Sequence, residues 1–315
     1  MQISKFVLPL ATLALSANIG LAAQLSSDAK SAIPRDVQQI ISVDYRAMQN
    51  SSAAMELKNR VLPPELKRLE NALKTSGLKV DQDADVLTFA AFRNGSSEGS
   101  RILGVAQGQF HTREIMNHFV KNKIKPTMLR NNSIYPMGAN GMNVVFLNQT
   151  TMVFGDQNAL QNALDARDGL TPSFLSNSEM VDEMGSVDQK AVWSLLDQKG
   201  TQTMMRSVLG EASQLADYDT VRNRMKSSRY TMDFQNGVKF DMAVVMSDTM
   251  TAATCATLLK GVSLLKKTQG NPLEKTALDQ TTIDSNAGTL TIAYSSSDSQ
   301  FASLLTSPLF QSVVR

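Results

Sequence analysis

The stretch SRYTMDFQNGVKFDMAVVM, residues 228–246, carries the clearest supersecondary pattern of the chain. Apolar and polar residues alternate on both sides of Asn236-Gly237, as expected for two antiparallel strands joined by a tight turn. Asn-Gly suits a two-residue turn because both central positions of such a turn need a positive φ. The stretch therefore predicts a β-hairpin and, with it, an antiparallel sheet.

Outward from the hairpin, the second half alternates strands with helices. Gly, Pro and Asn clusters separate segments of period 2 from segments of helical period. The predicted elements are a strand over 190–197, helices over 201–217 and 218–226, a long apolar helix over 249–267, strands over 281–286 and 289–295, and a closing helix over 296–307.

The first half has the same order of elements: strand, helices, strand, strand, helix, strands, helix. Pro63 and Pro64 start its second helix and Gly77 ends it. The predicted elements are a strand over 38–45, helices over 51–61 and 63–77, strands over 85–92 and 100–110, a helix over 111–123, strands over 133–137, 142–148 and 151–156, and a helix over 157–167.

This repeated order predicts an α+β fold of two related units, at 36–168 and 188–315, joined by a connector at 169–187. A β-α-β-β-α-β core in each unit is the ferredoxin-like pattern, here with extra strands. The two sheets can stand apart or share one extended antiparallel sheet. The long strands with a buried character favour the shared core.

Residues 1–23, MQISKFVLPLATLALSANIGLAA, have the layout of a secretory signal peptide. One cation, Lys5, precedes an apolar run over 6–15, and small residues end the segment at Ala23. The run is shorter than a bilayer-spanning helix, so we expect cleavage and no stable membrane span. The sequence thus predicts a periplasmic or secreted protein whose residues 24–35 form a flexible N-terminus.

Composition points to no charged partner. The formal net charge is +2 at pH 7, which implies neither nucleic acid nor any other global electrostatic partner. Cys255 is the single cysteine, so no intramolecular disulfide can form. It lies among apolar residues at helical spacing, which predicts a buried, inert thiol. Since no Gly-rich phosphate-binding motif occurs, no cofactor is expected.

Both histidines of the chain lie in GVAQGQFHTREIMNHF, residues 104–119. On a helix, His111, Glu114 and His118 would share one stripe, because seven residues make nearly two turns. A strand ends just before His111, however, so we expect this residue at the start of the helix, turned from the stripe. The spacing also differs from the metalloprotease pattern. We predict a strand running into an ordinary helix, with a metal site as the weaker alternative.

Two further patterns resemble known sites. Asp81, Asp83 and Asp85 alternate like the start of a calcium loop, but Val86 and Phe92 replace its glycine and glutamate, so an acidic turn is predicted. Ser263 and Lys266 match the S-x-x-K of penicillin-recognising enzymes. Ser27 and Lys30 match it equally well in the predicted flexible terminus, and the companion motifs are absent, which favours chance.

Local basic patches and methionines complete the candidates. One patch comprises Arg222, Arg224, Lys226 and Arg229 beside Tyr230, and the other Lys121, Lys123 and Lys125. We expect solvated faces, with anionic lipid or polysaccharide as the alternative partner. Nine of the 17 methionines lie in the second half, from Met180 to Met250, where core filling is predicted ahead of an adaptable binding surface.

The segment IPRDVQQIISVDYRAMQNS, residues 33–51, resembles the start of a loose set of exported bacterial proteins of unknown function. The matching positions are Pro34, Asp36, Val43 and Asp44. The segment FGDQNALQNALDARDG, residues 154–169, is similar to one that such proteins carry near mid-chain. The resemblance implies export and an α+β plan, and it carries no catalytic residue across.

Together these patterns favour an exported, non-catalytic protein acting as a binding or envelope-associated module on an unknown ligand or envelope partner. Two alternatives remain open. One is an envelope hydrolase using the His111, Glu114 and His118 helix or Ser263 with Lys266, and the other is a structural subunit that assembles through a sheet edge. The sequence leaves the oligomeric state open.

Overall fold

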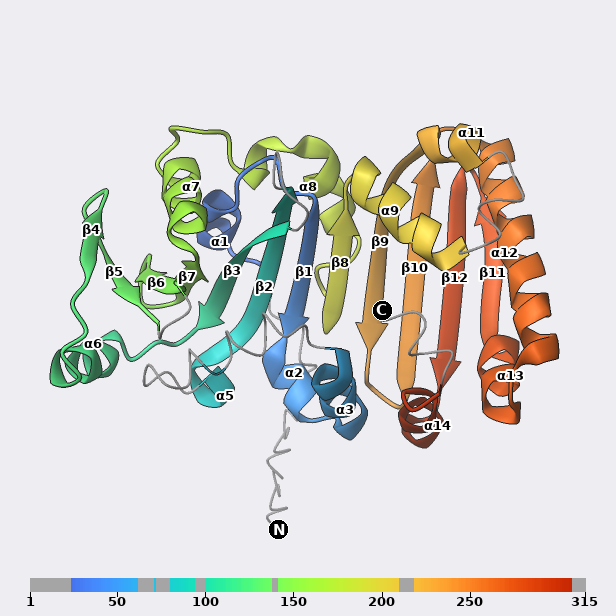
Figure 1. Cartoon of the computed structure of the whole chain (residues 1–315), viewed down its shortest axis with the longest axis horizontal. Helices are drawn as coiled ribbons and strands as arrows, with labels where there is room; N and C mark the ends of the chain where they lie inside the picture. The colour runs from blue at the N-terminus through green and yellow to red at the C-terminus, as the bar shows by residue number, and fades with distance from the viewer. Residues whose placement is uncertain are drawn as a thin grey trace, which may run out of the picture.

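The computed structural model describes residues 24–61, 71, 80–93, 100–137, 141–209 and 218–307. These residues form an α+β fold built on one 12-stranded sheet (Figure 1). The strand order is β11-β12-β10-β9-β8-β1-β2-β3-β7-β6-β5-β4, and all neighbouring strands pair antiparallel. The shared sheet favoured by the sequence is therefore present.

The first half supplies the strands from β1 to the β4 edge. Its elements are α1 (Ser27–Ala32), β1 (Gln39–Asp44), α2 (Tyr45–Gln49), α3 (Ser52–Val61), α5 (Val80–Asp83), β2 (Ala84–Arg93), β3 (Ser100–Gly108), α6 (Thr112–Lys121), β4 (Thr127–Leu129), β5 (Asn132–Pro136), β6 (Asn143–Phe146), β7 (Thr151–Gly155) and α7 (Gln157–Arg167).

The second half supplies the strands from β8 to the β11 edge. After the short helices η2 (Phe174–Ser176) and α8 (Ser178–Met184), its elements are β8 (Val192–Leu196), α9 (Gln198–Leu209), α11 (Tyr218–Asn223), β9 (Met225–Asp233), β10 (Val238–Met246), α12 (Thr249–Gln269), α13 (Pro272–Asp279), β11 (Thr281–Asn286), β12 (Thr289–Ser296) and α14 (Asp298–Leu304).

The two halves have the same strand order. Counted from the centre of the sheet, the first half runs β1-β2-β3-β7-β6 and the second β8-β9-β10-β12-β11. In each half, the strand that comes last of these five in the sequence lies in the sheet between the third and the fourth. It is β7, between β3 and β6, in the first half and β12, between β10 and β11, in the second. The strands predicted to correspond, β1 with β8 and β3 with β10, occupy equivalent places.

The halves are not ferredoxin-like, which corrects the finer part of the fold prediction. In a split β-α-β unit, a third strand lies between the two strands that the helix connects. Here β1 pairs directly with β2, and β8 with β9. The helices after β1 and β8 return the chain to the neighbouring antiparallel position. The order of elements in the sequence is compatible with both arrangements.

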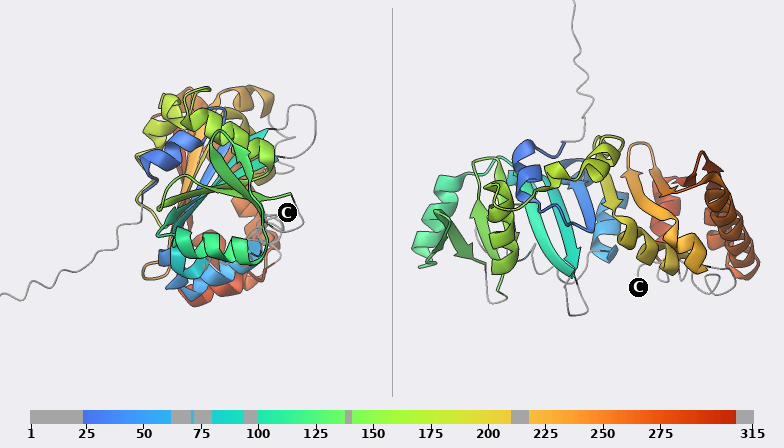
Figure 2. Two further views of the ribbon diagram at one scale, coloured as in Figure 1. Left: turned by 90° about the vertical axis from the view of Figure 1, so that its left-hand side faces the viewer. Right: turned by 90° about the horizontal axis from the view of Figure 1, so that it is seen from above.

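The halves join where β1 pairs with β8, and their cores lie on opposite faces of the sheet there. Trp193 and Leu195 face the core beneath α1, α7 and α8. Ser194 between them faces the other side. Its cross-strand partner Tyr230 and the next partner, Met242, belong to the core beneath α9, α11 and α12. Figure 2 shows α1 and α8 on one side of the sheet and α9 on the other.

Helices cover both faces of the first half, whereas the outer strands of the second half, from β10 to β11, are covered on one face. A separate cluster beneath α2 and α6 includes Phe119 and Phe154 and fills the second face of the first half. In β10, by contrast, the residues alternating with the core positions include exposed Lys239 and Asp241. An antiparallel sheet can have one solvent-exposed face, so no helix needs to pack on this face of β10.

The Asn236-Gly237 turn has the predicted backbone conformation but lies in a longer loop. Asn236 has φ 59° and Gly237 φ 98°. The strands end at Asp233 and resume at Val238, so four residues separate them and not two. Gln235 N–H donates to the Asp233 carboxylate at 2.9 Å, which stabilises the longer turn.

Residues 24–35, predicted to be a flexible N-terminus, are instead part of the fold. They form α1, capped by the Ser26 hydroxyl, and bury Leu25, Ala29 and Ile33 in the core beneath α7. This burial of apolar surface offsets the entropy of ordering the segment. The connector 169–187 is likewise helical in part, since it contains η2 and α8.

Two other predictions concern residues outside the described ranges. The signal peptide over 1–23 lies there entirely, and the helix over 63–77 almost entirely. The helix predicted over 201–217 corresponds to α9, and its last part, 210–217, also lies outside the described ranges. The remaining predicted strands and helices coincide with observed elements to within a few residues, while α1, α2, α5, α8, α13, η2 and β4 were not among those predicted.

Candidate functional site

The three candidate metal ligands of the first half do not converge. His111 precedes α6 as its N-cap residue, and its Nδ1 lies 3.7 Å from an Asp83 carboxylate oxygen. Glu114 is exposed, and the His118 ring contacts the neighbouring Phe119. The predicted strand running into a helix is present as β3 followed by α6. Within the described ranges, no three His, Cys, Asp or Glu side chains are placed to hold a metal ion.

The acidic triplet separates into different contacts. Asp83 ends α5, where its backbone carbonyl accepts a hydrogen bond from Gln109 N–H at 2.9 Å. Asp85 lies in β2 and forms an ion pair with Arg46 of α2. The side chain of Asp81 is outside what the structure describes. The predicted acidic turn leading into a strand is thus a short helix leading into a strand.

Neither S-x-x-K match forms a site. Ser263 and Lys266 lie on the distal half of α12, beside exposed Leu264 and Leu265, and make no side-chain hydrogen bond to each other. Ser27 and Lys30 lie on α1, which is ordered, contrary to the expected flexibility. A serine nucleophile needs an adjacent base within hydrogen-bond reach, and neither serine has one among the described residues.

The thiol of Cys255 is buried in the core beneath α12, as predicted. Burial raises its pKa to about 11. Because the thiolate is the reactive form of cysteine, this thiol is unreactive at neutral pH.

The first basic patch is largely neutralised by ion pairs. Arg222 pairs with Asp219 at 3.4 Å and Arg224 with Asp248 at 3.1 Å. Arg229 forms an ion pair with Glu183 of α8. Tyr230 packs against the core and is not a surface ring. The second patch, Lys121, Lys123 and Lys125, is exposed.

Most methionines of the second half fill the core, as predicted. Met204 and Met232 pack against it, and Met250 is 78% exposed. The fully buried ones are Met180, Met184, Met205, Met225, Met242 and Met246.

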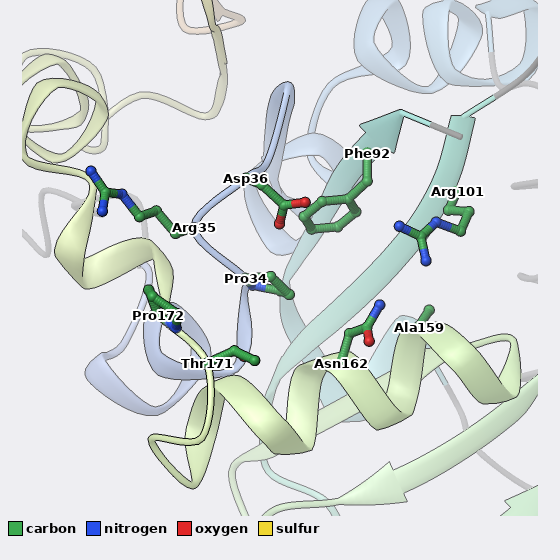
Figure 3. A pocket seen from close by; sticks show the side chains of 9 residues that line it. All are labelled: Pro34, Arg35, Asp36, Phe92, Arg101, Ala159, Asn162, Thr171 and Pro172. Atoms are coloured by element: carbon green, nitrogen blue, oxygen red, sulfur yellow. The ribbon is translucent and has the colours of Figure 1, made fainter. Parts of the chain in front are cut away.

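A cavity of about 500 Å³ on the α7 side of the sheet is the best candidate binding site. Pocket volumes of this order are typical of small-ligand sites. Hereafter it is called the α7 cavity (Figure 3). Its lining residues are Pro34, Arg35, Asp36, Phe92, Arg101, Ala159, Asn162, Thr171 and Pro172.

Two strands and one helix position the inner wall of the α7 cavity. Phe92 of β2 and Arg101 of β3 are direct cross-strand partners, so their side chains project from the same face of the sheet. Ala159 and Asn162 are three residues apart on α7 and therefore lie on one side of that helix. Phe92 and Ala159 are buried and provide an apolar floor.

The outer wall is a loop held by backbone hydrogen bonds. Pro34 forms an isolated antiparallel bridge with Ser173. Arg35 N–H donates to the Pro172 carbonyl at 3.0 Å, and Phe174 N–H donates to the Ile33 carbonyl at 2.7 Å. These bonds fix the backbone from which Asp36 projects, so the cavity is largely preformed.

Three polar side chains of the α7 cavity are available to a ligand. Among the described residues, the side chains of Asp36, Arg101 and Asn162 make no hydrogen bond or ion pair. In Figure 3 these three groups point into the cavity, whereas the Arg35 guanidinium points away from it. Asp36 and Asn162 are exposed and Arg101 is half-buried, so water solvates these groups and a ligand can replace it.

A second cavity, of about 600 Å³, lies between α8 and the ends of β8 and β9. Several of its polar groups bind other parts of the protein. Arg93 donates to Gln38 at 2.9 Å and lies 3.8 Å from Asp197, whose carboxylate also accepts from Gly200 N–H at 2.6 Å. Gln198 donates to the Met225 carbonyl at 2.9 Å. Three other charged groups of its lining, Glu179, Lys199 and Lys226, are all exposed, whereas Arg101 of the α7 cavity is half-buried next to buried Phe92.

The sequence did not predict the α7 cavity. Pro34 and Asp36 belong to the segment that resembles exported proteins, although no binding role was attached to them. Phe92, Arg101 and Asn162 were not singled out. No sequence signal marks them, because they meet only through the β2–β3 register and the packing of α7.

The fold and the cavity define a structural class: an α+β protein with one twelve-stranded antiparallel sheet and a cavity on its α7 side. No protein-family model and no curated protein matches the chain. None of the helices within the described ranges has the length and apolar character needed to cross a bilayer.

Among solved structures, the chain is similar to those of the protein TP0453. Crystal form I superimposes with a TM-score of 0.51 and 10% sequence identity, covering 89% of this chain and 97% of that one. Crystal form III superimposes with a TM-score of 0.50 and 8% sequence identity, covering 88% of this chain and 96% of that one. At this identity the likeness extends to the fold alone.

Proposed function

We propose that the protein is an exported, non-catalytic binding module whose ligand site is the α7 cavity. The observation that carries this proposal is a preformed cavity in which unpaired Asp36, Arg101 and Asn162 side chains surround an apolar floor. Ligand sites commonly combine an apolar lining with a few convergent polar groups. Export is proposed from the signal-like segment over 1–23.

The hydrolase alternative has less support. His118 lies on α6 near one end of the sheet, and Ser263 lies on α12 near the other (Figure 1). A nucleophile and its base must lie within hydrogen-bond reach. The α7 cavity itself contains no serine, cysteine or histidine in its lining.

The binding proposal is tested by closing the cavity. Asn162→Trp places a large side chain from an exposed position of α7 into the cavity, so the fold should tolerate it. Gln161→Trp, on the neighbouring exposed position outside the lining, is the matched control. A panel of small charged molecules is screened by thermal shift on the purified protein. At least one compound should stabilise the protein and the Gln161 variant but not the Asn162 variant.

If every stabilising compound acts equally on both tryptophan variants, the α7 cavity is not the ligand site. Export is tested separately by expressing the chain in a bacterial host and determining its N-terminal sequence. The protein should start near Gln24. Recovery of an intact Met1 in the soluble cytosolic fraction would contradict export.

A further inference from the structure

The α7 cavity holds two opposite charges that do not neutralise each other. Asp36 and Arg101 both line it, yet they form no ion pair. Their backbones explain why. Arg101 is fixed by strand pairing to Phe92, and Asp36 follows the loop that is bonded to Pro172. The fold therefore keeps a carboxylate and a guanidinium on separate walls of one cavity.

The carboxylate side suits a cation. Figure 3 shows the Asp36 carboxylate directed toward the Phe92 ring. An ammonium group placed there would pair with the carboxylate and lie near the aromatic ring. Arg35, which would repel an ammonium group, points away from the cavity.

The guanidinium side suits a carboxylate. Arg101 presents a planar fork of N–H donors that matches the two oxygens of a carboxylate. Asn162 on α7 points into the same space and adds an amide donor. Neither group has a partner among the described residues, so a ligand carboxylate would replace water and not a protein contact.

Between the two charged walls lies apolar surface. Phe92, Ala159 and Pro34 are buried and supply carbon atoms at the floor. At about 500 Å³, the cavity is of ordinary size for a small ligand. A molecule with an ammonium group, an apolar body and a carboxylate would satisfy both charges and cover the floor.

We infer that the α7 cavity binds an amino-carboxylate zwitterion, with its ammonium at Asp36 and Phe92 and its carboxylate at Arg101 and Asn162. This inference rests on the proposed binding function and specifies the ligand class. A free amino acid and the two termini of a short peptide share this chemistry.

The test uses four probes by isothermal titration calorimetry: the dipeptide Ala-Leu, N-acetyl-Ala-Leu, Ala-Leu amide and free leucine. Acetylation removes the ammonium group and amidation removes the carboxylate. Each change should weaken binding to the protein about tenfold or more, because charge-assisted hydrogen bonds are lost. Comparing Ala-Leu with leucine distinguishes a peptide from an amino acid as the source.

Variants of the cavity residues test which residue binds each end of the ligand. In Asp36→Asn, acetylation of Ala-Leu should no longer weaken its binding, while amidation still should. In Arg101→Gln, amidation should no longer weaken binding, while acetylation still should. Arg113→Gln, at an exposed position of α6 outside the cavity lining, should behave like the unchanged protein. If a variant fails to fold, the four probes on the unchanged protein still decide the question.

Equal affinity for the parent, acetylated and amidated peptides would overturn the zwitterion inference, as would failure of all four probes to bind. The proposed function would survive either result if another compound stabilises the protein and is blocked by Asn162→Trp. If no compound passes that test, the proposed function fails as well.

Discussion

Gly104 of β3 lies directly opposite Phe154 of β7, and the Phe154 ring occupies the space where a side chain at position 104 would start. A Cβ atom at Gly104 would lie 1.6 Å from Cε2 of that ring. The ring cannot easily move away, because it is 1% exposed and packs edge-to-face against Phe89, with 6.2 Å between the two ring centroids. This close approach explains why a glycine stands in the middle of a core strand.

We therefore expect Gly104→Ala to lower the free energy of unfolding by about 1–3 kcal/mol, the usual cost of overpacking a core. Urea unfolding measures it. Gly261→Ala is the control, since Gly261 lies on α12 with open space around its Cα, and alanine there should leave stability unchanged or raise it by up to about 1 kcal/mol. Equal stability of Gly104→Ala and the unchanged protein would mean that the ring is mobile.

The hairpin turn gives a second prediction. Gly237 has φ 98°, and a Cβ there would lie 2.4 Å from the Ser296 carbonyl oxygen. Gly237→Val should lower the free energy of unfolding by about 1 kcal/mol or more, from backbone strain and this clash. Asn236→Gly keeps a residue that adopts positive φ and should change stability little. Thermal melts of both variants provide the measurement, and an unchanged melt of Gly237→Val would contradict the turn geometry.

Buried acids of the second half predict sensitivity to alkali. Burial raises the pKa of Cys255 to about 11 from an ordinary value of 9.0, and burial also raises the pKa values of Tyr218 and Tyr230 above 10.0. The folded state thus holds these protons more tightly than the unfolded state. Their contribution to stability is complete below the unfolded values and is lost as pH rises through the folded ones.

We expect the melting temperature to fall steadily above about pH 9, where the unfolded thiol and then the phenols begin to ionise. Cys255→Ala should make the decline between pH 9 and 11 shallower. Melting curves at unit pH steps from 7 to 11 test this, and a decline that is identical in both proteins would show that Cys255 contributes nothing to it.

Much of the element pattern followed from the sequence, because the alternation in β10 and the helical period of α12 are local signals. Strand pairing was harder to predict from the sequence. The same order of elements allows a ferredoxin-like unit or the observed neighbour pairing, and only the packing of helices after β1 and β8 decides between them. The α1 segment was missed because its few small apolar residues become a core element only when α7 covers them.

The candidate site was less predictable than the fold. The histidine and serine motifs drew attention because their residue types are chemically reactive, yet their side chains point to different surroundings. Arg101 and Asn162 are ordinary residues in sequence. They share a cavity because β3 pairs in register with β2 and α7 packs across both, a relationship that no local pattern encodes.

The last prediction concerns the ion pair that ties α8 to β9. Arg229 and Glu183 are 27% and 24% exposed, and the pair joins the connector to the first hairpin strand of the second half. Removing one partner leaves the other partly buried and unpaired, which costs more than losing an exposed pair. A double-mutant cycle with Arg229→Met and Glu183→Gln should therefore give a coupling of about 1 kcal/mol or more. The exposed pair of Arg60 with Glu56, at 2.7 Å within α3, is the control and should give no more than about 0.5 kcal/mol. If both cycles give the same small coupling, the Arg229–Glu183 pair is a surface contact, and the β1–β8 pairing together with apolar packing holds the two halves together.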